Sequence, residues 1–386
     1  MKVKLCDAFD LQMGKTPARS DLSLWNGEHK WISIRDIGDA GKYIADTKEC
    51  ISDDGVAKSG IKIVPKGTVI MSFKLSIGKV SITAEDMYTN EAIMAFIDKK
   101  KYPIDTAYLY YLLSGTDWSE GSNKAVMGLT LNKATLSQKT ISIPALDKQR
   151  YVTNVLDKIS DLITLRKQQL DKLDELVKAR FVEMFEDPVD NNHEWQMQPL
   201  DSVCKTIVDC PHSTPSYTDE DTGYMCIRTS IIKKNRILWD DIEYIPEYEY
   251  YQRIQRKRPE KGDVVYTREG AILGIAAMID RECNVALGQR SMLLSPDITK
   301  CLPQFLSVAM NFESFLRKAL GGVIGSASPH INVGAIKAFA MILPPIELQQ
   351  HFAAFIEQSD KCRLTIQQGL DKLEMMKKAL MQEYFG

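Results

Sequence analysis

The feature that most constrains this 386-residue chain is an internal repeat. Ile141 to Gln149 aligns without a gap on Met341 to Gln349, a shift of 200 residues (341 minus 141). The register continues downstream, where Leu170 to Leu173 recurs as Leu370 to Leu373. A repeat of such a long period indicates duplicated domains rather than a solenoid of short units.

Upstream of these segments the two halves correspond only faintly. Ile34-Arg35 resembles Ile227-Arg228, and Lys66 to Ile70 resembles Lys261 to Val265. The halves are therefore predicted to share a scaffold and to differ in their globular parts. This pattern is expected if the shared part binds the same partner twice and each divergent part recognises a different target.

Each copy of the repeat predicts a long helix. Between Val152 and Met184 the apolar residues recur at alternating spacings of three and four, which is the pattern of one helical stripe. No Gly or Pro interrupts Asp147 to Asp187, and Pro188 then ends the helix. The second copy keeps its stripe, with Gly369 as a single weak point.

The two stripes are expected to bury each other as an antiparallel pair. The alternative is that each helix only covers its own domain. The residues expected at the pairing surface are Leu170, Leu173 and Leu176 of the first helix and Leu370, Leu373 and Met376 of the second.

The globular parts are predicted to be α+β. Short β-branched or aromatic runs such as Gly60 to Val64, Thr68 to Phe73 and Val264 to Tyr266 indicate strands, and helical patterns at Thr106 to Leu113 and Leu302 to Lys318 follow them. The expected domains are 1–145, the helix 146–187, a second domain 188–340 and the helix 341–386.

Composition fits a folded protein and indicates no membrane segment. Hydrophobic residues make up 44% and charged residues 26% of the chain. The longest apolar run, Ala271 to Ile279, is about half of the roughly 20 residues needed to cross a bilayer, and the N-terminus lacks a signal-peptide stretch. Eight cysteines without a Cys-x-x-Cys spacing are expected to be reduced, in a cytoplasmic protein.

Motifs for catalysis, metals or cofactors are missing from the sequence. Gly14-Lys15-Thr16 looks like the end of a phosphate-binding loop, but Phe9 stands where that motif needs a glycine. The glycine-rich run at 321–326 follows a predicted helix rather than a strand, which favours a flexible loop over a nucleotide site. No His-Glu-x-x-His, Asn/Asp-Pro-Pro-Tyr/Phe or Gly-x-Ser-x-Gly motif is present. The chain is therefore not expected to be an enzyme or to hold a metal.

Global charge does not indicate a nucleic-acid binder, since 49 Lys and Arg stand against 51 Asp and Glu. Local patches do. Arg253 to Arg258 and Lys233 to Arg236 are basic runs suited to phosphate contact, with an ordinary solvated surface as the alternative.

Two further pairs of segments hold equivalent places in the halves. Ser72-Phe73-Lys74 and Tyr266-Thr267-Arg268 follow corresponding strands and are expected at loop tips that contact DNA, or else to be structural hairpin residues. Asn132 and Asn332 lie 200 residues apart beside the long helices. Their equivalence fits the shared scaffold as well as DNA contact.

The opening and closing segments of each half carry a family resemblance. Together they resemble the DNA-specificity subunit of type I restriction-modification enzymes, over essentially the whole chain. The second opening departs from the pattern, with Cys210 to Pro215 in place of Gly-Lys-Thr-Pro. The segments that carry the resemblance are Leu11 to Pro17, Trp25 to Gly27, Trp31 to Ile37, Leu129 to Asn132, Ile143 to Gln149, His330 to Asn332 and Leu343 to Gln349.

This resemblance implies two target-recognition domains, each reading one half of a split site in double-stranded DNA. Because the domains differ, the site should be asymmetric, with half-sites about one DNA turn (roughly 34–36 Å) apart. It also implies that the helices hold two modification subunits, which supply S-adenosylmethionine chemistry on adenine, and that restriction subunits join them for cleavage. This chain itself would hold no cofactor.

Two other functions stay open from the sequence: a nonenzymatic coiled-coil adaptor with two protein-binding domains, and a free-standing nuclease or methyltransferase. The candidate DNA contacts are Thr16, Trp31, Arg35, Ser72, Lys74, Asn132, Arg228, Lys233, Lys234, Arg236, Arg253, Arg256, Lys257, Arg258, Thr267, Arg268 and Asn332.

Overall fold

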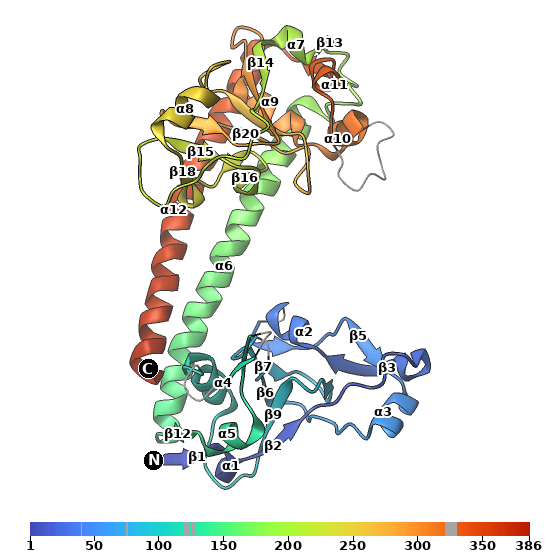
Figure 1. Ribbon diagram of the computed structural model, residues 1–386, viewed down its shortest axis with the longest axis vertical. Coiled ribbons are helices and arrows are strands. Elements are labelled where there is room, and N and C mark those ends of the chain that lie inside the picture. Colours follow the sequence, from blue (N-terminus) through green and yellow to red (C-terminus); the bar gives the residue numbers. More distant parts are fainter. Residues whose placement is uncertain (40, 75, 119–122, 126–127, 321–329) are drawn as a thin grey trace. The chain divides into compact units, whose positions relative to one another are not determined.

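The computed structural model describes residues 1–39, 41–74, 76–118, 123–125, 128–320 and 330–386 (Figure 1). The glycine-rich run at 321–326 lies outside these ranges. The chain forms two compact units: unit 1 is Met1–Lys167 with Gln368–Gly386, and unit 2 is Gln168–Gln367. Each unit therefore contains one globular part and a portion of both long helices.

Unit 1 is built on two sheets, and α4 (Thr106–Gly115) packs on the larger one. In the smaller sheet the central strand β3 (Trp25–Ile32) runs parallel to β8 (Tyr88–Thr89) and antiparallel to β5 (Glu49–Ile51). The larger sheet has the order β2 (Phe9–Met13), β9 (Ile93–Asp98), β6 (Val69–Ser72), β7 (Val80–Thr83) and β4 (Tyr43–Ile44), and the smaller has β5 (Glu49–Ile51), β3 (Trp25–Ile32) and β8 (Tyr88–Thr89).

Unit 2 repeats this plan, with α9 (Pro303–Met310) packed on its larger sheet. In the smaller sheet β15 (Met225–Ile227) runs parallel to β21 (Val285–Leu287) and antiparallel to β18 (Glu243–Tyr244). The larger sheet has the order β14 (Cys204–Asp209), β22 (Ser291–Pro296), β19 (Val264–Thr267) and β20 (Ala276–Met278), and the smaller has β18 (Glu243–Tyr244), β15 (Met225–Ile227) and β21 (Val285–Leu287).

The repeat thus extends through the globular parts as topology, although their sequences match only faintly. β2, β9, β6 and β7 of unit 1 correspond in order and direction to β14, β22, β19 and β20 of unit 2. The parallel pair β3 and β8 corresponds to β15 and β21. The central strands β6, β9, β19 and β22 are almost wholly buried, and many apolar sequences meet that requirement.

Short elements complete each unit. Two-stranded sheets join β1 (Lys2–Lys4) to β12 (Thr140–Ser142), β13 (Gln196–Pro199) to β23 (Ala340–Leu343), β10 (Asn123–Ala125) to β11 (Gly128–Thr130), and β16 (Ile232–Lys233) to β17 (Arg236–Ile237). The short helices are α1 (Leu5–Ala8), η1 (Leu22–Leu24), α2 (Ile34–Asp39), α3 (Asp53–Ser59), α5 (Lys133–Gln138), α7 (Leu200–Val203), η2 (Thr229–Ile231), η3 (Trp239–Asp241), α8 (Glu247–Arg253), α10 (Glu313–Leu320) and α11 (Val333–Lys337).

Two local predictions were wrong. Gly60 to Val64 forms no strand, and only Val64 makes an isolated bridge, to Met87. A single helix was predicted from Leu302 to Lys318, but the segment forms two helices, α9 and α10, because the helix is interrupted at Asn311. The Asn311 side chain instead accepts a hydrogen bond from the Ala276 amide at 2.9 Å and donates one to the Ala276 carbonyl at 2.8 Å.

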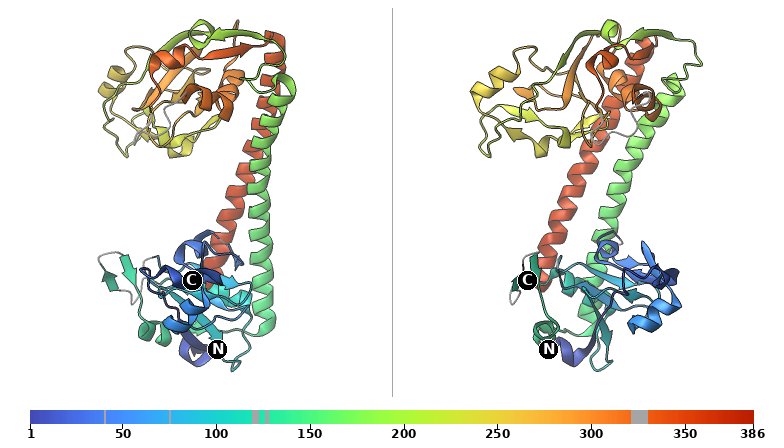
Figure 2. Two further views of the ribbon diagram at one scale, coloured as in Figure 1. Left: turned by 90° about the vertical axis from the view of Figure 1, so that its right-hand side faces the viewer. Right: turned by 45° about the vertical axis from the view of Figure 1, so that its right-hand side comes forward.

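The long helices are α6 (Leu146–Phe185) and α12 (Ile346–Phe385), each about 60 Å long at 1.5 Å per residue. Within each unit they lie side by side (Figure 2). α6 ends two residues before the predicted end, because Glu186 takes a left-handed backbone conformation with φ of 60°.

Each unit's core contains parts of both helices, which contradicts the alternative that each helix covers only its own domain. In unit 1 the end of α12, including Met381 and Phe385, packs with α4 and with Leu156 of α6. In unit 2 the end of α6 places Phe181 against Phe352 of α12, with ring centroids 5.4 Å apart. The helices are antiparallel in both units, as predicted.

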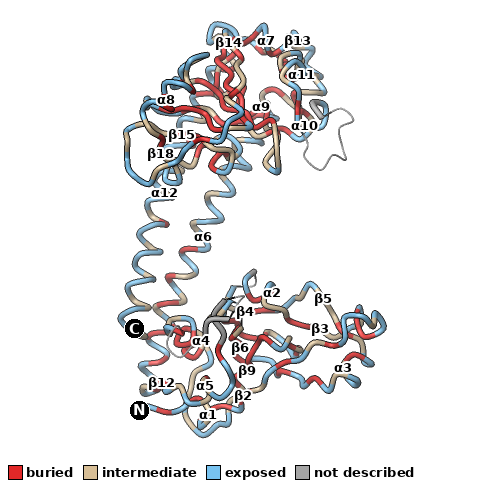
Figure 3. The backbone as a smooth tube through the Cα atoms, in the orientation of Figure 1, coloured by how far each residue is buried: buried red, intermediate tan, exposed pale blue. Residues whose placement is uncertain are grey.

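The predicted pairing stripe was only partly right (Figure 3). Leu370 is buried and Leu170, Leu173 and Leu373 are half-buried, but Leu176 and Met376 are 49% and 53% exposed. The reason is the helical face. On both helices the partly buried positions continue from 173 to 177 and from 373 to 377, so positions 176 and 376 point away from the partner helix. Ion pairs join Lys167 to Glu374 in unit 1 and Asp174 to Arg363 in unit 2.

A buried glutamine joins each long helix to its globular part. Gln149 is fully buried; its amide donates to the carbonyls of Pro103 and Pro144, and its oxygen accepts from the Asp105 amide, all at 2.8 Å. Gln349, 200 residues later, makes the same three contacts in unit 2. The sequence repeat is therefore also a repeat of this joint.

Candidate nucleic-acid interface

One edge of the larger sheet gathers the loops in each unit, and we call it the loop edge. It is formed where the first strand ends, the second begins and the third ends. The cross-strand partners that define it are Met13 with Met94 and Ser72 with Ile93 in unit 1, and Asp209 with Met292 and Thr267 with Ser291 in unit 2.

The closing segments return to this edge and reveal which residues correspond. The Leu131 amide donates to the Phe73 carbonyl at 3.0 Å, and the Ile331 amide donates to the Arg268 carbonyl at 2.9 Å. Phe73 therefore corresponds to Arg268, one residue away from the predicted match, and the counterpart of Lys74 is a glutamate. Lys74 is half-exposed and remains a candidate contact.

Ser72 and Thr267 are fully buried and close their hairpins. The Ser72 hydroxyl accepts from the Lys79 amide at 3.1 Å, and the Thr267 hydroxyl accepts from the Ile275 amide at 2.9 Å. Ser72 and Thr267 therefore act as structural hairpin residues, which was the alternative to DNA contact, and their burial leaves no side-chain surface for DNA.

Arg253 and Arg268 are also buried, so their predicted contact with DNA is corrected. The side chain of Arg268 is 6% exposed and makes two bonds to the Asp209 carboxylate, at 2.8 and 3.0 Å. Arg253 is 3% exposed, lies 2.9 Å from Glu249 and donates to the Ser213 carbonyl at 3.0 Å. Buried guanidinium groups need such partners, because an unpaired buried charge is costly.

These arginines fix the opening loop of unit 2, which we define as residues 210–216. Glu249 also accepts from the Ser216 amide at 3.0 Å. Burial alone would raise the pKa of Glu249, but the bonds from Ser216 and Arg253 outweigh it and hold the pKa below its ordinary value. His212 lies in this loop, 64% exposed, with its Nε2 atom 3.1 Å from Asp209.

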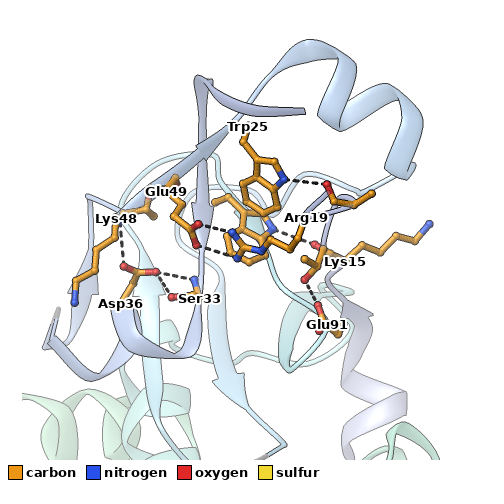
Figure 4. A network of polar contacts seen from close by, with 12 residues as sticks. Lys15, Arg19, Trp25, Ser33, Asp36, Lys48, Glu49 and Glu91 are labelled. Atoms are coloured by element: carbon orange, nitrogen blue, oxygen red, sulfur yellow. Dashed lines mark hydrogen bonds and ion pairs between the residues drawn. The ribbon is translucent and has the colours of Figure 1, made fainter. Parts of the chain in front are cut away.

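Tryptophans fix the opening loop of unit 1, residues 14–21 (Figure 4). The indole of Trp31 donates to the Lys15 carbonyl at 3.0 Å, and that of Trp25 donates to the Ala18 carbonyl at 3.2 Å. Trp31 is 1% exposed, so its predicted DNA contact is replaced by this supporting role. Thr16 bonds to Glu91 and is half-exposed.

Arg19 lies over both tryptophan rings in the same network. Its guanidinium carbon is 3.9 Å from the centroid of Trp25 and 5.0 Å from that of Trp31, and it forms a two-bond pair with Glu49. This pairing lowers the pKa of Glu49 and raises the pKa of Arg19. The Arg19 side chain is still 53% exposed.

Arg35 and Arg228 are not equivalent residues, contrary to the faint sequence match. The carbonyls of Ile32 and Ile227 accept from the residues that follow the parallel strands, at 3.0 and 2.8 Å, so these two isoleucines correspond. Arg228 pairs with Glu243. Arg35 is exposed on α2, whose start is fixed by Asp36 through its bond to the Ser33 amide.

The side chains of the two basic runs differ in exposure and in their partners. Lys234, Arg256 and Arg258 are exposed, although Arg256 also donates to the Asp209 carbonyl at 3.3 Å and Arg258 to the Asn284 side chain at 3.0 Å. Of the others, Lys257 pairs with Glu260, and Arg236 makes a two-bond pair with Asp174 on α6. Lys233 donates to the Ser230 carbonyl at 2.9 Å.

Asn132 and Asn332 serve as helix caps. The Asn132 side chain accepts from the Thr135 amide at 2.7 Å at the start of α5, and the Asn332 side chain accepts from the Gly334 amide at 2.8 Å at the start of α11. Both residues are exposed. Capping these helices is a scaffold role, as the sequence allowed for both residues, and their contact with DNA remains a prediction.

The carboxylates that hold these loops were missed from the sequence: Asp209, Glu249 and Glu49. Asp209 is 59 residues from Arg268, and Glu49 is 30 residues from Arg19. No periodic pattern signals such pairs. Only the i, i+4 spacing of Glu249 and Arg253 on α8 could have indicated one of them.

Among the described residues no group of three or more His, Cys, Asp or Glu side chains could hold a metal ion. In the same part of the chain no helix has the length and apolar character needed to span a membrane.

Comparison with known proteins decides the family. The sequence profile of the type I restriction modification DNA specificity domain matches residues 1–175 and 192–375, one copy for each half of the chain. The chain belongs to this family. The family resemblance noted in the sequence is thereby confirmed.

Relatives of known name match over nearly the full length of this specificity-family chain. The type I restriction enzyme MjaIX specificity subunit of Methanocaldococcus jannaschii is 22% identical, over 98% of this chain and 90% of the relative. The EcoprrI specificity subunit of Escherichia coli is 21% identical, over 92% and 86%.

Solved structures share the fold. The S subunit of the type I restriction-modification system from M. genitalium aligns with a TM-score of 0.52 and 13% identity, over 100% of this chain and 96% of that one. A chain solved in work on complex assembly and conformational transition of the type I R-M system gives a TM-score of 0.57 and 15% identity, over 100% and 97%. The predicted α+β fold with two recognition domains and long helices is confirmed.

Proposed function

We propose that this chain is the sequence-specific DNA-recognition subunit of a type I restriction-modification complex and reads an asymmetric bipartite site. The observation that carries the proposal is the pair of units with one topology and different loop edges, each built onto the same two helices. A duplicated reader of this kind presents two similar surfaces to DNA, one for each half-site.

The difference between the half-sites follows from the loop edges. In unit 1 the opening loop begins Gly14-Lys15-Thr16-Pro17, and in unit 2 it begins Cys210-Pro211-His212-Ser213. Lys74 at one hairpin corresponds to Glu269 at the other. Base edges in the major groove differ in their donors and acceptors, so loops with different donors and acceptors select different bases.

Phosphate contacts supply the rest of the affinity. Arg35 in unit 1 and Lys234, Arg256 and Arg258 in unit 2 are exposed basic side chains suited to this role. They make the interaction with DNA dependent on salt, although the net charge of the chain is only −2.

The long helices would dock two modification subunits, one at each unit. Large apolar side chains are exposed on them, namely Leu162 and Met376 in unit 1 and Leu176 and Leu364 in unit 2, with 47% to 61% of their surfaces free. Apolar surface of this kind marks a protein interface where it is contiguous, so we take these four residues as the positions at which docking should be tested. S-adenosylmethionine would bind the modification subunits, and restriction subunits would join for cleavage, in the cytoplasm.

The function is tested by adding components in turn. The purified chain alone should neither methylate nor cleave DNA, because the sequence carries no catalytic motif. With its modification subunits it should methylate adenine at one bipartite sequence and retain that DNA in a pulldown. Methylation by the pure chain, or a complex that assembles but selects no sequence, would overturn the proposal in favour of an enzyme or an adaptor respectively.

Exchange of one domain tests whether each unit reads its own half-site. Replacing residues 1–145 with those of a relative should change one half-site in methylome sequencing and leave the other half-site unchanged. A change of both half-sites together would contradict independent reading by the two units.

A further inference from the structure

Each opening loop carries one exposed side chain that is held in place by an acidic partner. In unit 1 this is Arg19, 53% exposed and paired with Glu49, and in unit 2 it is His212, 64% exposed and paired with Asp209. Neither was among the residues that the sequence marked as DNA contacts. Both loops leave the sheet at equivalent backbone positions, since the amides of Gly14 and Cys210 donate to the first residues of β9 and β22.

The side chain of Arg19 is already held in a fixed conformation that could bind a base edge. Its planar group is stacked on Trp25 at 3.9 Å and fixed by Glu49, which uses two of its five N–H donors. The remaining donors are free to meet the acceptors of a base edge, and arginine pairs with O6 and N7 of guanine. Because the side chain is already ordered, little conformational entropy is lost on binding.

His212 is held by a chain of contacts that begins in the core of unit 2. Arg268, buried, fixes the Asp209 carboxylate through two bonds, and Asp209 in turn holds Nε2 of His212. Arg253 fixes the next residue, Ser213, through its carbonyl. Because Nε2 donates to the carboxylate, the other ring nitrogen, Nδ1, stays available and is an acceptor in the neutral imidazole.

The surroundings of the unit 1 loop fit base recognition better than a simple phosphate site. A hollow of about 620 Å³ is lined by residues 14–18 and 21 of this loop, together with α3 and Glu91; Arg19 itself is not part of the lining. Lys15 and Lys58 bring cationic groups to it, and Asp21 and Glu91 bring carboxylates, which also accept hydrogen bonds from Ser23 and Thr16. A phosphate would be repelled by the carboxylates, whereas base edges present donors as well as acceptors.

We propose that the opening loop of each unit reads bases, with Arg19 as the specificity-determining side chain of one half-site and His212 as that of the other. This inference rests on the proposed function as a DNA-recognition subunit. It goes further by naming the reading residue in each unit and the carboxylate that positions it.

The experiment uses the full chain assembled with its modification subunits and a DNA library randomised at the recognised positions. Methylation is profiled for the unmodified complex and for Arg19→Ala, Arg19→Gln, His212→Ala and His212→Gln. Both Arg19 variants should lower discrimination at one or two positions of one half-site by about 5- to 150-fold, which is the range for one base-specific contact. Both His212 variants should do the same only in the other half-site.

Two variants of matched chemistry serve as controls. Arg281 stacks over Trp239 at 4.6 Å and pairs with Asp280 at 52% exposure, but lies outside both opening loops. His193 lies 3.7 Å from Glu186 at 44% exposure, in the segment before β13. Arg281→Ala and His193→Ala should leave both half-site profiles unchanged.

The outcomes separate the two proposals. If the unmodified complex methylates no defined sequence, the proposed function fails before any variant is compared. If it does, and the Arg19 and His212 variants keep the original profile, the inference is overturned. Equal loss of methylation at all sites with a lowered melting temperature, seen in both substitutions of a residue, would also overturn it, because that result indicates a structural role.

Discussion

At the scale of single residues, arginines that are neighbours in the sequence have different roles. Arg253 and Arg256 belong to one basic run, yet Arg253 is buried against Glu249 while Arg256 is exposed and donates to the Asp209 carbonyl at 3.3 Å. Arg253 is the last residue of α8, whereas Arg256 lies in the segment that follows this helix. Charge in the sequence therefore identifies the segment, and burial decides which member can reach a phosphate.

These two residues should respond differently to substitution. Arg256→Ala should weaken DNA binding by the assembled complex and reduce the slope of log K against log salt by about 0.9, since one phosphate contact is lost. It should leave the unfolding free energy almost unchanged. Arg253→Ala should instead destabilise unit 2 by about 3–5 kcal/mol, because Glu249 loses its buried partner. Binding isotherms at several salt concentrations and urea unfolding measure both; equal behaviour would contradict the assignment.

The pH dependence of stability tests the Glu249 site. Its pKa in the folded protein lies below the ordinary value of 4.5, so its stabilising effect is fully present above about pH 4.5 and is lost as the pH falls through the folded pKa. Glu249→Gln should cost about 3 kcal/mol at pH 7. The gap between variant and unmodified chain should shrink in urea unfolding below pH 4.5. A gap that stays constant with pH would show that the carboxylate charge is not what stabilises the loop.

How much of the candidate site the sequence could predict depends on distance along the chain. Charge runs and repeat equivalence can be read from the sequence because both are local properties, and the DNA contacts that they indicate stay predictions. The pairing of Arg268 with Asp209 and of Arg19 with Glu49 depends on strand order, so the sequence placed Arg268 on the surface and overlooked Arg19. Trp31 was misassigned for the same reason, since its partner is the carbonyl of Lys15.

At the scale of elements, the ends of the long helices act as core elements of the units. In unit 2, Phe181 is fully buried and its ring contacts those of Phe185, Phe305, Phe312 and Phe352, with centroids 4.8–5.4 Å apart. The next residue, Val182, is 43% exposed. The helix therefore changes from interior to surface within one residue.

This contrast gives a matched pair of substitutions on one turn of α6. Phe181→Ala should destabilise unit 2 by about 3–5 kcal/mol, the usual cost of removing a buried aromatic ring. Val182→Ala should cost less than about 1 kcal/mol, because the side chain is largely in water. Thermal and urea unfolding measure the two. Similar losses would mean that the aromatic cluster does not fix the helix in the core.

The two long helices were predictable and the order of strands in the sheets was not, for physical reasons. The apolar stripe of a helix depends only on residues close together in the sequence. It therefore predicted the end of α6 to within two residues. The apolar pattern did not fix the exact helical face, so Leu176 and Met376 were expected to be buried, whereas the partly buried positions are 177 and 377. Strand order depends on pairing between distant segments, and the shared order of the two larger sheets was visible in the sequence only as faint matches.

At the scale of the whole molecule, both helices belong to both units. The boundary between units crosses α6 between Lys167 and Gln168 and crosses α12 between Gln367 and Gln368. The ion pair of Lys167 with Glu374 lies in unit 1, and that of Asp174 with Arg363 lies in unit 2. A change of length in one helix alone would therefore break the register of at least one of these pairs.

The last prediction uses this requirement to test whether the helices set the spacing of the half-sites. Inserting 22 helix-forming residues at both boundary positions adds about 33 Å, close to six whole helical turns and to one turn of DNA. Each unit then keeps its own helix contacts, and DNA presents both half-sites on the same side as before. The unread spacer should lengthen by about ten base pairs, with the bases of both half-sites unchanged in methylome sequencing. The same insertion in α6 alone should prevent assembly with the modification subunits, because the opposing helix no longer matches. An unchanged spacer after the double insertion would show that the helices do not measure the site, and that the two units find their half-sites independently of helix length.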